Sequence, residues 1–201
     1  MSHGQRSIYL ASASPRRGEL LRQIGILHEV RPVDIDESAL PGEAPAHYAL
    51  RLAQEKARAL WDRLPVAERR PVLAADTTVA LGSAILGKPG DRADAVAMLQ
   101  RLSGRVHEVH TAIAVLHDGG ADSRLSTSTV AFRTLNAQEI AWYWDTGEPA
   151  DKAGAYAVQG KAAIFIRQLT GSYSGVMGLP LFETWELLAP VLGLNGRGAG
   201  A

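Results

Sequence analysis

The spacing of hydrophobic positions changes several times along the chain, which indicates a fold that mixes strands with helices. Short apolar runs predict buried strands, and runs with two-residue alternation predict strands with one solvent-facing side. The strands predicted in this way are 7–11, 28–33, 72–75, 106–116 and 125–132. We expect the last two to be neighbours in a sheet, and the glycine-containing, β-rich segment 153–169 to add further strand.

Helices are predicted where apolar residues recur at helical spacing and capping residues stand at the ends. Ser14 is a candidate N-cap with Pro15 at the first helical position, and Asn136 with Glu139 has the spacing of a capping box. The predicted helices are 15–24, 45–64, 92–102, 137–144 and 179–192. Strands and helices therefore mix along the whole chain, which favours an α/β fold with a mixed sheet flanked by helices over a purely parallel, doubly wound sheet.

Composition narrows the function classes. The 201 residues include 21 Lys and Arg and 21 Asp and Glu, so the formal net charge is zero. Proteins dedicated to nucleic acids or to anionic membranes carry an excess of positive charge, so we expect neither as a partner. The absence of cysteine excludes disulfides, thiolate nucleophiles and cysteine metal sites, and leaves oxygen and nitrogen groups for any chemistry.

Length and terminal sequence predict a simple organisation. We expect residues 1–195 to form one domain and residues 196–201 to be a flexible C-terminal tail. The apolar run before Arg16 is too short for a signal peptide, and no stretch approaches the roughly 18 apolar residues of a membrane span. We therefore expect a cytoplasmic protein without membrane contact.

The first candidate site is the turn at 12–17, which leads into the first predicted helix. A helix N-terminus offers unpaired N–H groups and the positive end of the helix dipole, where acidic residues are usual. This turn instead carries Arg16 and Arg17, with hydroxyls at Ser12 and Ser14. Backbone donors, hydroxyls and guanidinium groups together suit phosphate oxygens. The alternative is that both arginines are solvated and paired with acids.

The second candidate is Asp76, which follows the predicted strand 72–75 together with Thr77 and Thr78. A carboxylate at the end of a buried strand can orient water, accept a proton or bind a divalent metal. Taken alone, an Asp in this position more often closes an Asx-turn or caps a helix, so the residue type by itself favours that alternative.

Two further charged residues are candidates. Lys88 ends the segment 82–88, which matches the first seven positions of a phosphate-binding P-loop. Position eight is Pro89, which lacks both the metal-binding hydroxyl and the N–H, so we reject a P-loop and keep Lys88 as a phosphate contact in a rigid turn. Glu37, in an acidic loop, is a candidate metal carboxylate, with simple solvation as the alternative.

Seven short blocks occur in order between about Ile8 and Leu192. They are Ser12-Ala13-Ser14-Pro15-Arg16-Arg17, Ala75-Asp76-Thr77, Gly87-Lys88-Pro89, Leu102-Ser103-Gly104, Asp151-Lys152-Ala153-Gly154-Ala155-Tyr156, Gln159-Gly160 and Gly178-Leu179-Pro180. Together they resemble the Maf family of nucleoside triphosphate pyrophosphatases. The resemblance implies a Maf/ITPase-like α/β fold, in which a long, mixed, twisted sheet and flanking helices form two lobes with a central cleft. It also implies a homodimer, and cleavage between the α- and β-phosphates with Mg²⁺ or Mn²⁺.

The candidate sites described above and the resemblance to the Maf family together give the candidate functional residues. They are Asp76, Lys56 and Lys88 for catalysis, Ser12, Ser14, Arg16, Arg17, Thr77 and Gln159 for substrate binding, and Glu37 and Asp76 for the metal. By resemblance, Asp76 is the proton acceptor that activates water, and the lysines are basic groups around the triphosphate. Arg16, Thr77 and Gln159 match positions linked to pyrimidine selectivity.

Arg16 and Gln159 favour the branch of the family that hydrolyses dTTP and UTP over the branch that prefers 7-methyl-GTP. The Gln159 amide can pair with the O4–N3 edge of uracil or thymine, but because an amide can flip, it does not by itself exclude cytosine. The expected role is house-cleaning of nucleotide pools. Two alternatives remain: a nucleotide-binding regulator linked to septum formation and cell division, and an unrelated α/β phosphatase that releases inorganic phosphate.

Overall fold

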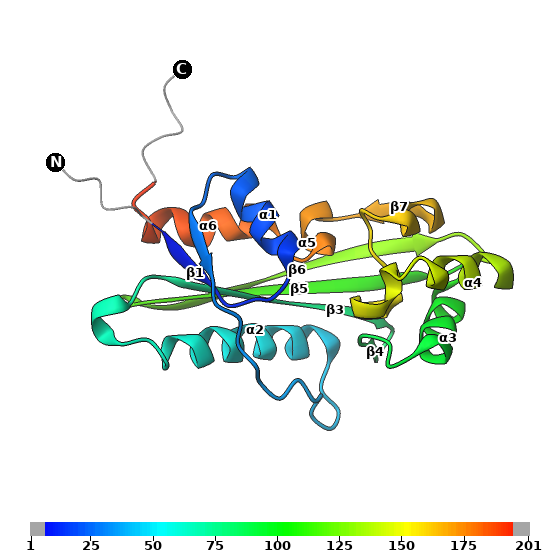
Figure 1. Ribbon diagram of the computed structural model, residues 1–201, viewed down its shortest axis with the longest axis horizontal. Coiled ribbons are helices and arrows are strands. Elements are labelled where there is room, and N and C mark those ends of the chain that lie inside the picture. Colours follow the sequence, from blue (N-terminus) through cyan, green and yellow to red (C-terminus); the bar gives the residue numbers. More distant parts are fainter. Residues whose placement is uncertain (1–6, 195–201) are drawn as a thin grey trace, which may run out of the picture.

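One mixed sheet is the framework of the molecule. The computed structural model describes residues 7–194, so the tail expected at 196–201 lies outside the described residues. Within these residues the sheet has seven strands: six follow the order β2-β1-β3-β5-β6-β7, and β4 pairs with β3 off this path. β1 pairs in parallel with β2 and β3, and the other pairs are antiparallel. The predicted mixed sheet with flanking helices is confirmed (Figure 1).

The element bounds are as follows. The strands are β1 (Ile8–Leu10), β2 (His28–Val30), β3 (Val72–Leu81), β4 (Ala84–Leu86), β5 (Val106–His117), β6 (Gly120–Phe132) and β7 (Ile166–Thr170). The α-helices are α1 (Pro15–Gln23), α2 (Pro45–Trp61), α3 (Arg92–Leu102), α4 (Ala137–Asp145), α5 (Tyr173–Met177) and α6 (Leu181–Val191). Within residues 7–194, no helix combines the length and hydropathy needed to cross a membrane.

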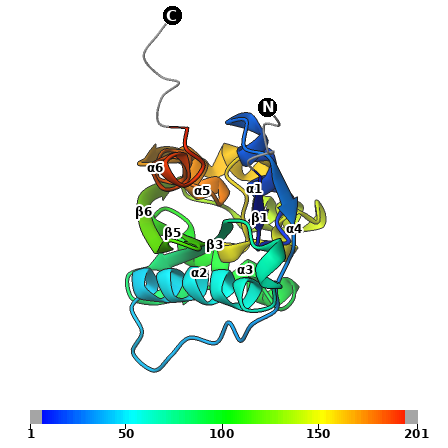
Figure 2. The ribbon, with the colours of Figure 1, turned by 90° about the vertical axis from the view of Figure 1, so that its left-hand side faces the viewer.

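Helices cover both faces of the sheet (Figure 2). On one face, Ala53 of α2 shares a buried cluster with Ala74 of β3. On the opposite face, Leu21 of α1 and Leu188 of α6 share a cluster with Leu73 of β3. Successive residues of β3 therefore serve different cores, as the two-residue period of a strand requires.

A third core lies at the other end of the sheet, where α3 and α4 pack with β5 and β6. Phe132, Tyr143 and Phe165 are its largest fully buried side chains, and Phe165 meets both other rings edge to face. Figure 1 shows this part at one end of the sheet and β1, α1, α2 and α6 toward the other. These are the two expected lobes.

The segment 153–169, predicted to be β-rich, consists mostly of 3₁₀ turns. Ala153–Ala155 and Lys161–Phe165 are 3₁₀ helices, and strand begins only with β7. Side-chain hydrogen bonds explain the difference, because the Glu148 carboxylate accepts from two backbone N–H groups of the second turn. Such bonds give the backbone an alternative to strand pairing. Gly160 allows this approach, since a Cβ there would lie 2.3 Å from the carboxylate oxygens.

Other bounds also differ from those predicted. The second strand ends at Val30 rather than Val33, the strand predicted at 125–132 begins at Gly120, and the turn predicted at 82–89 contains β4. Gly82 has a φ of 61°, which permits a tight reversal and brings β4 back against the end of β3. The hairpin therefore extends the sheet where a loop was expected.

β3 is longer than predicted, and this difference places the site. Asp76, predicted at a strand end, lies in the middle of β3. β5 pairs with β3 along most of its length on one side. On the other side, β1 pairs only with the first two residues and β4 only with Val79–Leu81. Among the described residues, no strand pairs with 74–78 on that side, which leaves a gap in the sheet.

A buried histidine connects the sheet to the third core. His107 of β5 is 2 % exposed, and its Nε2 lies 2.9 Å from the Tyr156 hydroxyl. The ring also meets Phe132 edge to face. Burial lowers the pKa of His107 to about 4, because a protonated imidazole would lose its hydration at this position.

We predict that His107 makes the stability of the protein depend on pH. Below a pH of about 6.5 the unfolded chain binds a proton at this residue, whereas the folded chain does so only near pH 4. The free energy of unfolding therefore falls by about 2 kcal/mol between pH 7 and pH 5. Urea unfolding of His107→Gln at both pH values should show a drop smaller by this amount. His117→Gln is the control, and an unchanged drop in His107→Gln would contradict the prediction.

Candidate active site

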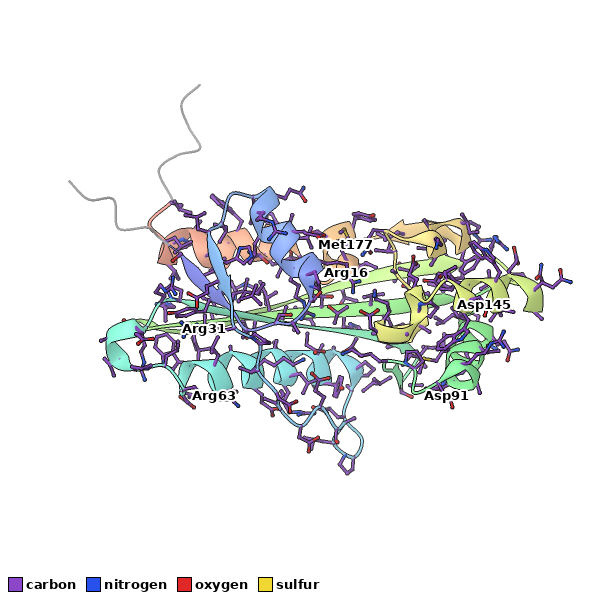
Figure 3. The ribbon with its side chains drawn as sticks, viewed as in Figure 1. Arg16, Arg31, Arg63, Asp91, Asp145 and Met177 are labelled. Carbon is purple, nitrogen blue, oxygen red and sulfur yellow. The ribbon has the colours of Figure 1, made fainter. Side chains whose placement is uncertain are left out.

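A cavity of about 610 Å³ opens at the gap in the sheet. Its walls come from segments distant in sequence: the turn before α1, α2 with the loop before it, β3, the loop after β4, the segment 151–158, and α5. Because a gap in a sheet gives access to both faces, neighbouring residues of β3 reach the cavity although their side chains alternate. Arg16 of α1 and Met177 of α5, both labelled in Figure 3, line the cavity.

The ammonium group of Lys56 lies between two carboxylates. Its Nζ is 2.8 Å from Oδ1 of Asp76 and 2.6 Å from Oε1 of Glu37. Lys56 comes from the sheet-facing side of α2 and Asp76 from the middle of β3, and both are buried. Glu37 reaches them from the loop before α2 with about half of its side chain exposed. Three residues far apart in sequence thus meet at one point.

Asp76 is also held at its second carboxylate oxygen. Thr78 Oγ1 donates to Oδ2 over 3.2 Å, and Thr78 is 2 % exposed. Both oxygens therefore contact side chains, and because Asp76 lies inside β3 rather than in a turn or at a helix end, the alternative of an Asx-turn or a helix cap is wrong. A carboxylate fixed in this way at a cavity wall is positioned to accept a proton or to contact a cation.

The loop that carries Glu37 is held by two side chains of α2. The hydroxyl of Tyr48 donates to the carbonyl of Glu37 over 2.7 Å. Arg51 donates to both carboxylate oxygens of Glu43, over 2.7 and 2.8 Å, and also to the carbonyl of the residue after Glu37. These bonds fix the carbonyl of Glu37 and that of the following residue, and so hold the loop from which the Glu37 carboxylate reaches the ammonium group.

The surroundings of the cavity shift the pKa values of Glu37 and Tyr48 in opposite directions. Burial acts to raise the pKa of Glu37, but the hydrogen bond and charge of Lys56, with two further positive side chains, outweigh burial and lower that pKa. At Tyr48, burial and the nearby carboxylates raise the pKa of the hydroxyl to about 12. At neutral pH the cavity therefore contains a charged Glu37 and a neutral Tyr48.

The two arginines of the turn have different surroundings. Arg17 donates within the protein, from Nε to the carbonyl of Gly178 (2.8 Å), from Nη1 to Ser12 Oγ (2.9 Å) and from Nη2 to Thr77 Oγ1 (3.3 Å). Burial lowers the pKa of Arg17. Arg16 lines the cavity, and its buried Nε has no hydrogen-bond partner among residues 7–194. The alternative in which both arginines pair with acids is therefore wrong for Arg17, whose donors go to uncharged oxygens.

Three hydroxyls complete this side of the cavity. Ser12 Oγ accepts hydrogen bonds from Arg17 and, over 3.2 Å, from the N–H of Ser14. Ser14 is the N-cap residue of α1, but its hydroxyl makes no capping hydrogen bond. Thr77 Oγ1 lies 3.1 Å from Thr111 Oγ1, which donates to a backbone carbonyl of α5. Thr77 is therefore held from α1 and from β5.

The last two sequence candidates lie in different places. Lys88 is exposed in the loop after β4 and lines the cavity. Gln159 is also exposed, but it is not one of the lining residues, whereas the preceding Val158 is. The structure thus brings all of the candidate residues except Gln159 to the wall of one cavity.

Some polar side chains at the site were missed by the sequence analysis. Tyr48, Thr78 and Lys152 line the cavity, and Thr111 lies behind Thr77. Thr78 and Lys152 stand next to or within the motif blocks, so their position in the sequence was a usable signal. Tyr48 and Thr111 carried no such signal, because they reach the site only through the packing of α2 and β5 on β3.

The carboxylates around Lys56 fit a divalent metal only together with other oxygen ligands. One cation, the ammonium group, already lies within 2.8 Å of both Asp76 and Glu37. In the part of the chain that the structure describes, no group of three or more His, Cys, Asp or Glu side chains could hold a metal. Mg²⁺ commonly uses one or two carboxylates with waters and substrate phosphates. The donor set therefore fits a metal that is bound jointly with an anionic ligand.

Comparison with known proteins defines the class of this fold and site. Residues 7–191 match the family model described as Maf-like protein, and the chain belongs to the Maf family. A dTTP/UTP pyrophosphatase of Nitrosomonas europaea is 53 % identical, over 90 % of this chain and 92 % of the relative. The dTTP/UTP pyrophosphatase of Methylobacillus flagellatus is 55 % identical, over 90 % of this chain and 90 % of the relative. That of Bordetella avium is 53 % identical, over 94 % of this chain and 96 % of the relative.

One solved structure shows a distant likeness. The Staphylococcus aureus Ham1 protein is 16 % identical, with a TM-score of 0.42 over 63 % of this chain and 70 % of that chain. The family resemblance drawn from the sequence motifs is confirmed by the match to the family model over nearly the whole chain.

We predict that Arg17 and Arg16 contribute differently to stability. Arg17→Lys replaces a planar group with three directed bonds by a single ammonium, so buried acceptors lose partners and the free energy of unfolding should fall by about 1–3 kcal/mol. Arg16→Lys is the matched change at a side chain whose buried Nε bonds to none of the described residues, and it should stay within about 0.5 kcal/mol of the wild type. Urea unfolding measures both, and equal losses would contradict this distinction.

Proposed function

We propose that this protein hydrolyses dTTP and UTP to the nucleoside monophosphate and pyrophosphate, and so removes unwanted nucleotides from the cellular pool. The observation that carries the proposal is the meeting of Asp76, Lys56 and Glu37 in a cavity that also receives the basic turn before α1. Relatives with that activity in their names are 53–55 % identical to this chain over most of its length.

The proposed reaction is an attack of water on the α-phosphorus. Asp76 accepts a proton from the water, and Lys56 and Thr78 hold its carboxylate in place for this role. A bond forms between the water oxygen and phosphorus, the bond from phosphorus to the bridging oxygen breaks, and pyrophosphate leaves with the electron pair. Positioning and charge neutralisation provide most of the catalysis in such reactions.

The triphosphate would be bound by side chains with unused donors. Arg16 offers a buried Nε without a partner in the described part of the chain, and Lys88 is exposed at the cavity wall. Ser14 stands at the N-terminus of α1, where backbone N–H groups and the helix dipole favour anions. Arg17 acts by holding Ser12 and the neighbouring strand in place.

We propose Mg²⁺ or Mn²⁺ as the cofactor, with Glu37 and Asp76 as its protein ligands. The metal, when bound, supplies charge neutralisation at the phosphate oxygens. Lys56 holds the two carboxylates close together, which preassembles these oxygen ligands. The loop bonds from Tyr48 and Arg51 serve the same arrangement, because they fix the backbone that carries Glu37.

Selection of the pyrimidine base is proposed for Arg16, Thr77 and Gln159. Thr77 is fixed by contacts from α1 and β5, and Arg16 lines the same cavity. Gln159 follows the lining residue Val158 directly in the sequence. An amide in this place can match both the carbonyl and the N–H of uracil or thymine.

We also propose that residues 1–195 act as one domain, that the protein works as a homodimer and that it is cytoplasmic. The single sheet to which all strands of residues 7–194 belong supports one domain. The absence of long apolar helices in the same region is compatible with a site of action among free nucleotides.

We predict that UTP and dTTP with Mg²⁺ or Mn²⁺ yield pyrophosphate, so that phosphate is detected only after inorganic pyrophosphatase is added. CTP and GTP should react more slowly under the same conditions. Asp76→Asn should lower kcat by about 10²–10⁴, because the amide cannot accept the proton of water. The measurement is a phosphate assay with and without the coupling enzyme.

Asp62→Asn, at an exposed position after α2, is the matched control and should retain wild-type turnover. Phosphate without the coupling enzyme would identify a phosphatase instead. A UTP-induced rise in melting temperature without any product would identify a nucleotide-binding regulator. Near-normal turnover of a folded Asp76→Asn variant would contradict the role of Asp76 while leaving the activity itself established.

We predict that Gln159→Glu weakens the preference for UTP over CTP by about tenfold. The carboxylate loses the N–H donor of the amide, and leaving one polar group of the base unpaired costs about 1–3 kcal/mol. The ratio of kcat/KM for UTP to that for CTP measures this effect. Gln168→Glu, on the exposed side of β7, is the control. The same ratio in both variants would count against base contact by Gln159.

A further inference from the structure

The outer edge of β6 has no strand beside it over most of its length. β7 pairs with β6 only at Thr129–Phe132, and within residues 7–194 no strand pairs with Gly120–Ser128 on that side. Figure 2 shows β6 at the side of the sheet, with α6 in the layer above it and α2 in the layer below. A long exposed edge is a template for pairing with another chain.

The backbone groups of Ser123 point away from the sheet. In an antiparallel pair, successive residues turn their N–H and C=O groups alternately toward the partner strand and away from it. The N–H of Phe132 donates to Arg105 on the β5 side, and the β5–β6 register is unbroken up to Ala131, so odd-numbered residues of β6 face outward. In agreement, the carbonyl of Ser123 accepts a hydrogen bond from the side chain of Arg124.

The charged residues on this edge are complementary to those on the same edge of a second copy. Asp122 and Arg124 flank Ser123, and both are exposed. If two copies of the strand pair in antiparallel orientation with the two-fold axis at Ser123, Asp122 of each copy stands opposite Arg124 of the other. These are the closer, non-hydrogen-bonded positions of the pair, where opposite charges stabilise and like charges destabilise.

The same register matches a large side chain with a small one. It places Leu125, which is 37 % exposed, opposite Ala121 of the other copy. Both share the side of β6 that faces α2, because Ser123 of the same parity is bonded by Gln54 of α2. Ala121 lines a groove of about 480 Å³ between β6 and α2. Other apolar residues of that groove are Ala59, Ala114 and Leu116.

We propose that the outer edge of β6 is the surface on which two copies of this chain pair, with the two-fold axis at Ser123 and one sheet continuous through both. A second copy fits this edge because a single register satisfies the charges and also places Leu125 of each copy at the groove of the other. The surface shares no residue with the cavity lining, so its test is independent of the proposed reaction.

Charge reversal tests the pairing in solution. Analytical ultracentrifugation of the full chain should show a dimer. Asp122→Arg and Arg124→Asp each place like charges opposite one another, twice by symmetry, and each should raise the dissociation constant of the dimer at least about tenfold. The double variant restores opposite charges and should recover the wild-type value. Glu19→Arg, an equal charge change at an exposed site on α1, is the control.

A single cysteine tests the register, since the natural chain has none. Ser123→Cys brings two thiols together at the axis, where the Cα atoms of a hydrogen-bonded antiparallel pair lie about 5.5 Å apart, within the range of a disulfide. Oxidised glutathione should convert this variant into a covalent dimer on a non-reducing gel. Ser83→Cys, exposed in the β3–β4 turn, is the matched control and should remain uncrosslinked.

The outcomes separate clearly. Loss of the dimer in both single charge variants, recovery in the double variant and cross-linking of Ser123→Cys alone would establish the edge and its register. A wild-type chain that sediments as a monomer at micromolar concentration would overturn the proposal. So would a dimer that neither charge variant weakens, or equal cross-linking of both cysteine variants, because the copies would then meet through another surface or through none.

Discussion

Incomplete strand pairing along one side of β3 is the constraint on which the site depends. β1 leaves the sheet after three residues to enter the turn before α1, and β4 rejoins it only at the far end of β3. A continuous strand there would have buried Asp76 in a closed sheet. The gap instead exposes both faces of β3 to one cavity. The N-terminus of α1 lies at the wall of this cavity, as is common where a parallel strand is followed directly by a helix.

Charge pairing and hydrogen bonding then determine which side chains in this gap hold the structure together and which have donors available to a ligand. Lys56 is buried and is stabilised there by two carboxylates, since an unpaired ammonium would be costly in that position. Arg17 directs its donors to three oxygens of the protein, whereas the buried Nε of the neighbouring Arg16 has no partner within the described region. Both arginines line the cavity, but they have different tasks, because the donors of Arg17 are used within the protein and the buried Nε of Arg16 is not.

Local sequence signals predicted the helices and strands better than the contacts between residues that are distant in sequence. The capping box at Asn136 and the proline before Arg16 act within one turn, and both helices begin where predicted. The strand through Asp76 was predicted too short, because a buried carboxylate inside a strand is tolerated only when a side chain from another element, here Lys56 of α2, satisfies it. The segment 153–169 was misassigned for a related reason, since a glutamate carboxylate holds its backbone. Contacts from distant elements, such as that of Tyr48 to the loop, leave no local pattern.

The dispersed origin of the cavity has a consequence for how the molecule unfolds. Its walls come from almost every layer, and β1, which leads into the basic turn, pairs with residues more than 60 positions further along the chain. No hairpin or helix pair contains a usable part of the site, so the cavity forms only when the whole sheet has assembled. A ligand bound there is linked to the global folding equilibrium rather than to the opening of one segment. A ligand bound in the cavity therefore stabilises the entire sheet, and the supply of that ligand and the lifetime of the protein become coupled quantities.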